Sequence, residues 1–254
     1  MLRDDPGPFG NRLTRYGRGP IWVLTVGCLA FMAASAAHAV VREDPWGGAG
    51  FAVGAGLWAF VLNFFRNPTR VPPADPDVIV SPADGKVFEV TRVENEEYID
   101  GPATRVSVFL NVFNVHVNRS PVDGVVRYVK HHAGKFHSAT RPDCREVNER
   151  QSVGVEMEDG TRVVVRKIAG LIARRICCPL EEGDRLERGF DYGMIRFGSQ
   201  TEISLPERPG YRLELDVAPG QGVQGGVSSI GRWVKVDAPL EVSGSTAGSA
   251  GESG

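Results

Sequence analysis

Two long uncharged segments near the N-terminus constrain this chain more than any other feature. Residues 21–41 contain no Asp, Glu, Lys or Arg, and residues 47–65 form a second such segment after a short charged break. An α-helix rises about 1.5 Å per residue, so about 20 residues cross a hydrocarbon core of roughly 30 Å. The pattern therefore predicts two membrane-spanning helices, forming a transmembrane helical hairpin over residues 20–66.

The arginines around these segments predict their orientation. Arg12, Arg15 and Arg18 precede the first segment, and Arg66 and Arg70 follow the second, whereas the break has one arginine beside two acids. Positive flanks favour the cytoplasmic side. We therefore expect a cell-membrane protein with a basic cytoplasmic N-terminus, residues 1–19, and with the domain after the hairpin also in the cytoplasm.

A cleaved signal peptide is the alternative interpretation. Basic residues, an apolar stretch and the A-x-A pattern Ala37-His38-Ala39 resemble the n-region, h-region and cleavage site, and would leave Val40 as the mature N-terminus. The second apolar segment favours the hairpin, and its Gly50 and Gly54 form a GxxxG spacing that allows close helix contact. The sequence alone leaves both interpretations open.

The rest of the chain has the pattern of β structure, with short β-branched runs between turn signals. No long amphipathic helix is predicted after residue 70, and residues 168–177 fit either a buried strand or a helical turn. A mainly β domain is expected over residues 67–240, followed by a Gly/Ser-rich tail, residues 241–254, predicted to be disordered. The predicted strands are residues 78–80, 86–93, 105–110, 122–129, 162–167 and 211–217, with hairpin-type Asp-Gly turns at 84–85, 123–124 and 159–160.

Composition removes several function classes. The net charge of -2 gives no electrostatic argument for a nucleic-acid partner. The four cysteines show no CxxC pair, which favours a reducing compartment. His131, His132 and His137 are close enough in sequence to suggest a metal site, but no further ligands at suitable spacing accompany them, so a polar loop is favoured and no metal is expected.

Four short stretches carry residues capable of chemistry. Taken singly, each is commonly a plain turn or a packed side chain: Asp84 lies in a Pro/Gly turn, His116 lies among apolar residues, and Gly198-Ser199 precedes a strand-like run. Their order and spacing are more specific than any one of them. The stretches are VSPADGK at 80–86, FNVHVNRSPVDG at 113–124, KHHAGKFH at 130–137 and RFGSQT at 196–201, accompanied by FRNP at 65–68, NER at 148–150 and IAGLIARRI at 168–176.

Together these motifs resemble the pyruvoyl-dependent phosphatidylserine decarboxylases of the short bacterial and archaeal type, over residues 60 to 235. The resemblance implies a compact β-sandwich or barrel-hybrid catalytic core behind a membrane-associated N-terminus. It also implies a lyase of phospholipid biosynthesis that converts phosphatidylserine in the membrane to phosphatidylethanolamine and carbon dioxide.

The resemblance implies that the cofactor is made from the chain itself. The Ser199 hydroxyl would attack the Gly198 carbonyl, and β-elimination from the resulting ester followed by loss of ammonia would leave a pyruvoyl group at position 199. Its carbonyl would form a Schiff base with the substrate amine and act as the electron sink for decarboxylation. The working enzyme would pair chain 1–198 with chain 199–254, with a homodimer possible by family analogy, and no metal is implied.

Residue roles transfer less cleanly. The long members of the family carry two histidines three residues apart, whereas this chain has His116 and then Arg119. We expect His116 to be a proton donor or base in decarboxylation. The base for self-cleavage stays open between His116 and a mechanism that depends on Asp84 and backbone strain. Candidate groups for the lipid headgroup are Arg119, Lys130, Lys135 and His137.

Two non-enzymatic alternatives stay open. A VSPADG turn in a β domain also resembles biotinyl or lipoyl carriers, but their lysine lies in an MKM or DKA context that Lys86 lacks. A secreted β-rich binding domain would follow from the signal-peptide interpretation. A serine hydrolase is disfavoured, because no G-x-S-x-G motif is present.

Overall fold

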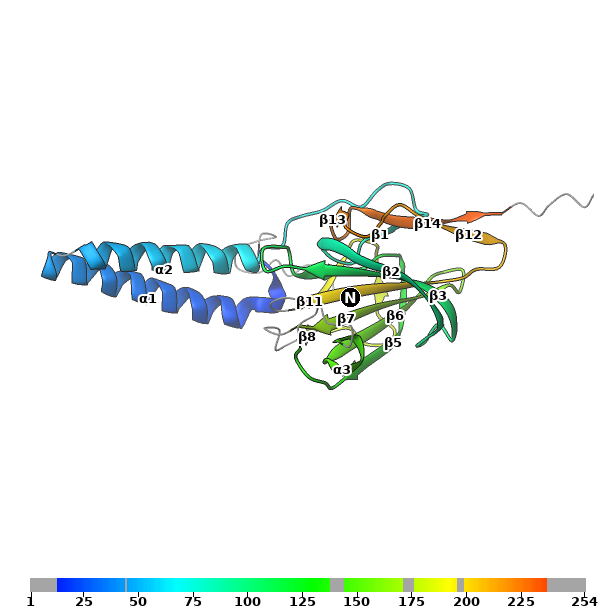
Figure 1. Ribbon diagram of the computed structural model, residues 1–254, viewed down its shortest axis with the longest axis horizontal. Helices are drawn as coiled ribbons and strands as arrows, with labels where there is room; N and C mark the ends of the chain where they lie inside the picture. Colours follow the sequence, from blue (N-terminus) through cyan, green and yellow to red (C-terminus); the bar gives the residue numbers. More distant parts are fainter. Residues whose placement is uncertain (1–12, 44, 138–143, 171–175, 196–198, 237–254) are drawn as a thin grey trace, which may run out of the picture.

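An apolar helical hairpin projects from one end of a β domain (Figure 1). The computed structural model describes residues 13–43, 45–137, 144–170, 176–195 and 199–236. A 3-10 turn, Arg15–Gly17, leads into helix α1, Arg18–Arg42, and helix α2 covers Pro45–Phe64. Both helices are long and apolar enough to cross a membrane by length and composition. The predicted helix pair is therefore confirmed.

The two helices pack through small residues. A Cβ added to Gly54 would lie 2.6 Å from Met32 Cγ, and one added to Gly50 would lie 2.7 Å from Ser35 Oγ. Larger side chains would push the helices apart, so the GxxxG spacing forms the contact predicted for it. Glu43 ends α1 in the left-handed conformation, with φ 52°.

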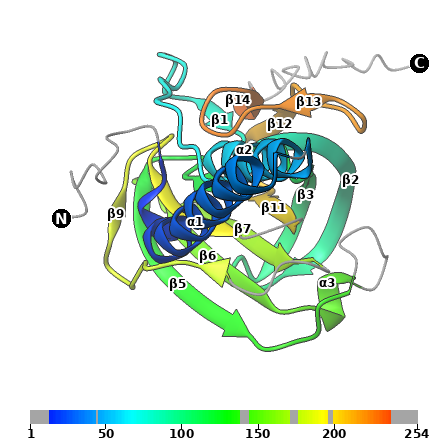
Figure 2. The same ribbon diagram turned by 90° about the vertical axis from the view of Figure 1, so that its left-hand side faces the viewer.

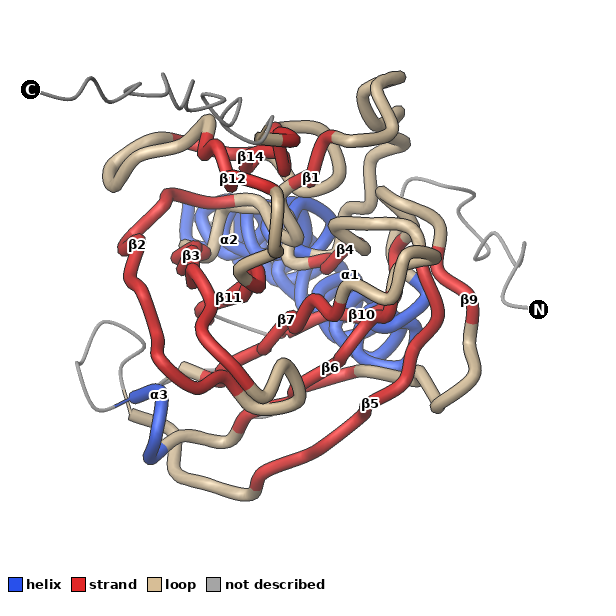
Figure 3. Tube along the Cα trace, turned by 90° about the vertical axis from the view of Figure 1, so that its right-hand side faces the viewer, coloured by secondary structure: helices blue, strands red, loops and turns tan. Residues whose placement is uncertain are grey.

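The β domain consists of one large and two small antiparallel sheets. The large sheet has the order β13-β2-β3-β11-β7-β6-β5-β9, and the small ones have the orders β1-β14-β12 and β4-β10-β8. Figure 3 shows the large sheet curling into an open half-barrel with the sheet of β1, β14 and β12 against it. The mainly β prediction is thus confirmed. The strands are β1 Val78–Val80, β2 Gly85–Glu96, β3 Gly101–Leu110, β4 Val117–Arg119, β5 Gly124–His132, β6 Arg150–Glu156, β7 Arg162–Ala169, β8 Ile176–Cys177, β9 Arg185–Leu186, β10 Asp191–Ile195, β11 Ser199–Pro206, β12 Tyr211–Leu215, β13 Gly222–Val223 and β14 Ser229–Lys235.

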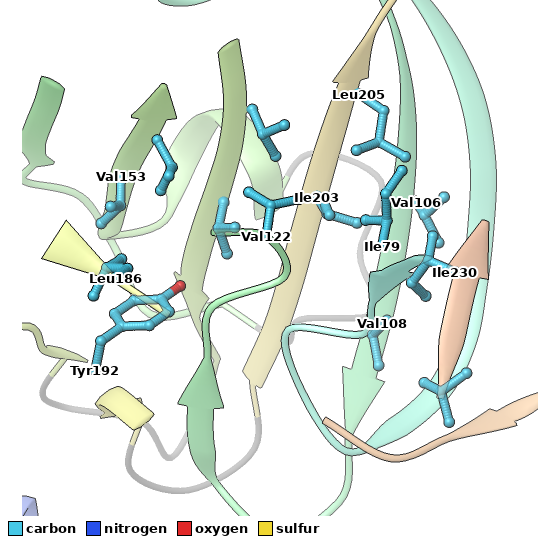
Figure 4. Close-up of a cluster of buried hydrophobic side chains, with 14 of the residues drawn as sticks. Ile79, Val106, Val108, Val122, Val153, Leu186, Tyr192, Ile203, Leu205 and Ile230 are labelled. Carbon is cyan, nitrogen blue, oxygen red and sulfur yellow. The ribbon is translucent and has the colours of Figure 1, made fainter. Parts of the chain in front are cut away.

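The hydrophobic core lies between the large sheet and the two small ones (Figure 4). Alternate residues of the central strand β11, Ile203 and Leu205, point into it and are fully buried. Ile79 and Ile230 reach it from the small sheet of β1 and β14, and Tyr192 reaches it from β10. This period of two fixes which face of β11 meets the core.

The other face of β11 carries buried charge. Glu202 has no exposed surface, and it accepts hydrogen bonds from Arg145 Nε at 2.6 Å and Arg166 Nη1 at 3.5 Å. Arg145 comes from a one-turn helix, α3, Cys144–Val147. Arg166 also pairs with Glu96 at 2.5 Å. A one-residue slip of β11 would place these charges in the apolar core, so the two faces together hold its register.

The predicted turns were right in part. Asp159-Gly160 joins β6 to β7, which pair as a hairpin. The other two Asp-Gly pairs do not form hairpins, because β1 pairs with β14 and β4 with β10. At the first of these turns, a Cβ on Gly85 would lie 2.1 Å from the Phe109 carbonyl oxygen, so close passage past β3 requires glycine there.

Residues 168–177 extend β7 to Ala169 and contribute β8 at their end, while 171–175 lie outside the described residues. After α2, the only helix in the described part of the chain is the four-residue α3, as the sequence pattern predicted. The tail at 241–254 and residues 1–12 also lie outside the described part.

Candidate active site

Ser199 begins β11, at the end of the β domain from which the helices project (Figure 1). It pairs with Leu110 of β3 on one side and Ala169 of β7 on the other. The side chain is fully buried, and its Oγ has no hydrogen-bond partner. Buried hydroxyl groups are usually paired, so this one calls for a functional explanation. Gly198 lies outside the described residues.

His116 lies at the same end of the domain. Asn118, two residues along the chain, donates from Nδ2 to Thr201 Oγ1 at 3.0 Å, which ties β4 to β11. The His116 carbonyl accepts a hydrogen bond from the Ile195 amide at 3.3 Å. Ile195 in turn packs with Ala169, the strand partner of Ser199. These links place the serine and the histidine that the sequence singled out at the same end of the domain.

The contacts of His116 indicate its tautomer. Nδ1 lies 2.9 Å from the carbonyl oxygen of Asn114, and because a carbonyl only accepts, the hydrogen is assigned to Nδ1. Nε2 then has a lone pair, and it is buried without a partner. Burial lowers the pKa of His116 to about 4. The imidazole is therefore neutral at pH 7, with Nε2 available as a base.

Helix α2 closes the other side of this histidine. The Phe64 ring, at the end of α2, packs on the imidazole with a centroid separation of 4.3 Å. Figure 2 looks along the hairpin onto this end of the β domain. The site therefore lies where the apolar helices meet the sheet.

Asp84 is close to this region but is paired with Arg70. Its carboxylate accepts from Arg70 Nη1 at 2.5 Å, from Arg70 Nη2 at 2.7 Å and from the Gly225 amide at 2.8 Å. The Arg119 amide donates to the Pro82 carbonyl at 2.9 Å, which holds the Asp84 turn beside β4. Sequence reasoning missed Arg70 as a site residue; its position soon after the FRNP motif was the available signal.

Arg119 and Lys130 are both engaged with protein groups. Arg119 is buried, and its guanidinium donates to the Gly189 and Pro68 carbonyls at 2.9 Å and to Asn67 Oδ1 at 2.6 Å. It therefore ties the segment after α2 to the β domain. Lys130, on β5, is exposed and bonds to Glu97 at 2.9 Å. Three strand spacings, about 14 Å, separate β5 from β11.

The loop carrying Lys135 and His137 borders the site. The Lys135 amide donates to the Val147 carbonyl at 2.8 Å, and the His137 amide donates to Asn148 Oδ1 at 2.9 Å. Asn148 Nδ2 donates in turn to the Ala169 carbonyl at 2.8 Å. This places the loop at the end of the sheet where β11 begins. Among the described residues no group of three or more His, Cys, Asp or Glu could hold a metal ion.

A buried lysine on β7 escaped the sequence analysis. Lys167 has no exposed surface, lies 4.4 Å from the Tyr192 ring centroid, and donates to the Cys177 carbonyl at 3.4 Å. Burial lowers its pKa. Lys167 follows Val163 and Val165 at every second position of the strand, and alternate residues of a strand share a face. This spacing was the available signal that Lys167 lies on the same face as those valines. Its amine is engaged, whereas His116 Nε2 is not.

Fold and site together define a class of protein: a β-rich domain on an apolar helical hairpin, with a buried serine–histidine site where the two meet. The sequence model described as phosphatidylserine decarboxylase matches residues 57–231, more than half of the chain. The chain therefore belongs to the phosphatidylserine decarboxylase family, and the prediction of an enzyme of this family is confirmed.

Curated relatives agree with this assignment, and all three described here carry the name phosphatidylserine decarboxylase proenzyme. The protein from Carboxydothermus hydrogenoformans is 47% identical over 69% of this chain and 81% of its own length. That from Symbiobacterium thermophilum is 48% identical over 71% and 82%. That from Salinibacter ruber is 40% identical over 74% and 82%.

Proposed function

We propose that this chain is a phosphatidylserine decarboxylase precursor that cleaves itself between Gly198 and Ser199, with His116 as the base. The observation that carries the proposal is the pair of buried, unpartnered polar atoms, Ser199 Oγ and His116 Nε2, at the same end of the domain. Such atoms are costly to bury unless they react or bind something. The names of the relatives, which describe proenzymes, support the same conclusion.

The first step is an acyl shift. As Ser199 Oγ bonds to the Gly198 carbonyl carbon, its proton passes to His116 Nε2, and the peptide C–N bond breaks with that proton going to the departing amine. Removal of the Cα proton of residue 199 then breaks the Cβ–O bond and releases the Gly198 carboxylate. Water then displaces the nitrogen of residue 199, which leaves as ammonia, and residue 199 becomes a pyruvoyl group. The low pKa of His116 keeps the imidazole neutral at pH 7, so Nε2 carries a lone pair before the transfer.

The site fits a group of this size. The pyruvoyl would occupy the buried space of Ser199 at the start of β11, held from both sides by β3 and β7. Bound there, it supplies a carbonyl that condenses with an amine and accepts the electron pair released with carbon dioxide. His116, at the same end of the domain, would hold a proton at Nε2 for the substrate carbon, and the Phe64 ring covers one side of the imidazole.

Asp84 takes a positioning role in this proposal. Both of its oxygens accept hydrogen bonds from Arg70, so the carboxylate is engaged in holding that side chain. The pair fixes the segment that follows α2 against the Gly225 backbone, to which Arg70 also donates at 2.7 Å. For the lipid headgroup we propose the loop of Lys135 and His137, which borders the site.

The cleaved chains would stay together as a heterodimer of residues 1–198 and 199–254. Strand β11 would belong to the second chain yet pair on both sides with strands of the first. Strand β14 of the second chain pairs with β1 of the first. The possible homodimer stays a prediction.

We place the enzyme at the cell membrane with the hairpin retained and the β domain in the cytoplasm, following the arginine flanks. The start of the hairpin packs into the β domain, which supports retention over signal cleavage. Tyr16 Oη donates to the Asp191 carbonyl at 2.8 Å, and the Thr14 amide donates to the Phe65 carbonyl at 2.8 Å. Removal of residues before Val40 would break these contacts.

Intact mass under denaturing conditions tests the proposal. Active protein is expected to give two chains that meet at Gly198 and Ser199, with the second chain blocked to Edman degradation. Ser199→Ala is expected to give one chain of 27.5 kDa with no release of carbon dioxide from phosphatidylserine vesicles. His116→Gln is expected to slow cleavage strongly. Activity from an uncleaved chain would refute self-cleavage, and acylation at Lys86 would favour the carrier alternative.

A further inference from the structure

We propose that the turn at residues 111–114 inserts into the headgroup–acyl boundary of the bilayer, with Phe113 as its lipid contact. His116 would then lie at the depth of the phospholipid headgroups, and substrate would enter from the plane of the membrane. This inference deepens the proposed function by naming a lipid-binding surface beside the same site. The occupant is a glycerophospholipid of the bilayer.

The side chain of Phe113 lies against the outside of the apolar helix α2 and is not buried under it. Its side chain is 66% exposed, although it is large and apolar. Its ring meets Phe60 of α2 edge-on, with a centroid separation of 6.2 Å. Phe60 precedes Phe64, the last residue of α2, by about one helical turn, or roughly 5 Å along the axis. If α2 spans the bilayer, the Phe113 ring lies on the membrane side of the boundary marked by the end of α2.

Arg66 marks the level of that boundary. Its Nη1 donates to the Asn63 carbonyl at 2.7 Å, and its Nη2 donates to the Phe113 carbonyl at 2.8 Å. An arginine just after an apolar helix lies at the level of the headgroups, where its charge meets phosphate and water. The backbone of Phe113 is therefore at this level, and its ring reaches back along the helix.

Three amides of the turn that carries Phe113 have hydrogen-bond partners within the turn itself. The Phe113 amide donates to Asn111 Oδ1 at 2.8 Å, the Asn111 amide donates to Asn114 Oδ1 at 2.9 Å, and the Asn114 amide donates to the Asn111 carbonyl at 3.0 Å. Unpaired amides are costly away from water. A self-paired turn can enter the interface at a lower cost than an open loop.

The same turn orients the imidazole. The Asn114 carbonyl accepts a hydrogen bond from His116 Nδ1 at 2.9 Å, and Phe64 of α2 packs on the imidazole ring. One short segment thus links a lipid-facing aromatic to the proposed base. Because both lie at the end of α2, the serine headgroup of a lipid need not leave the bilayer surface to reach the site.

Site-specific photocrosslinking of the full chain tests the insertion. Benzoylphenylalanine is placed at position 113, or for control at Tyr211, which is 38% exposed on β12. The protein is reconstituted into phosphatidylcholine–phosphatidylserine vesicles with radiolabelled lipid. Lipid label at position 113 is expected to exceed that at 211 at least fivefold. Equal labelling, or crosslinking of 113 to a second copy of the chain, would overturn the proposal.

Self-cleavage does not enter this readout. The same crosslinking in the Ser199→Ala chain is expected to give the same result, so failure of the insertion and failure of the proposed cleavage are told apart. In the processing-competent chain, Phe113→Ser is expected to raise the apparent KM for phosphatidylserine in vesicles several-fold more than it lowers kcat, with Phe113→Leu restoring most of the loss. A fall in kcat alone would contradict a lipid contact.

Discussion

The buried, neutral state of His116 makes a quantitative prediction about stability against pH. Burial lowers its pKa from the usual 6.5 to about 4. The unfolded chain takes up the proton first as pH falls, so the neutral histidine contributes stability above pH 6.5 that is lost progressively as pH falls toward 4. With these two pKa values, the loss between pH 8 and pH 4.5 is about 2.5 kcal/mol.

The measurement uses chains that cannot cleave, so that one species unfolds. Ser199→Ala is compared with Ser199→Ala/His116→Gln, because glutamine does not titrate and every other group is shared. A loss of about 2.5 kcal/mol corresponds to roughly 5–10 °C in Tm for a chain of this size. The Tm of the single variant should therefore fall by that much more than the Tm of the double variant as pH drops from 8 to 4.5.

The outcome bears directly on mechanism. If the Tm difference between the two variants stays constant across this pH range, the pKa of His116 is not depressed, and the argument for a neutral base fails. A difference that begins near pH 6.5 and keeps growing below pH 4 would show a pKa lower than about 4. Thermal melting followed by intrinsic fluorescence in detergent is sufficient for the comparison.

Three other substitutions test the packing around the site. Glu202→Gln leaves a buried positive charge uncompensated and should lower the free energy of unfolding by about 3 kcal/mol, whereas Glu94→Gln, on a side chain that is 85% exposed, should change it by less than about 0.5 kcal/mol in the same denaturant titration. Arg119→Lys loses the planar guanidinium that donates to Asn67, Pro68 and Gly189, and it should lower Tm and slow self-cleavage, as followed by gel electrophoresis. Wild-type-like cleavage would show that these contacts are dispensable. Gly193→Ala would place a Cβ 2.4 Å from a backbone carbonyl and should cost about 1–3 kcal/mol in the same titration, and an unchanged midpoint would contradict that tight packing.

The sequence was a good guide where the physics is local. A single uncharged segment crosses a bilayer as a helix, because a helix satisfies the backbone hydrogen bonds within the segment. Both helices were therefore predicted within a few residues of their ends. β-branched runs located β1 and β7. Pairing was not predictable, because the partner of Val78–Val80 is Ser229–Lys235 at the other end of the chain. Local turn chemistry at Asp84-Gly85 suggested a hairpin, but this long-range pairing prevented one.

The site residues show the same contrast between local sequence signals and long-range contacts. Ser199 and His116 were singled out because short motifs carry them, and both lie at one end of the β domain. The role of Asp84 was open because its partner, Arg70, lies in another segment. Glu202 is buried by the curl of the sheet and by α3, and no local motif in the sequence indicates this. Burial of a polar face depends on what covers it, and that is a tertiary property.

Cleavage before β11 would cut the chain at the edge of its most central strand, and the pairing of that strand explains why the product could survive. Ser199–Pro206 pairs along its whole length with β3, and Ser199–Ser204 pairs with β7. The first residue of the new chain is therefore held by neighbouring backbones on both sides. A reactive carbonyl needs a fixed position relative to its proton donor, and rigid strands supply this better than loops. The pairing from Gln200 to Pro206 does not involve the bond that breaks, so the strand keeps its position after cleavage.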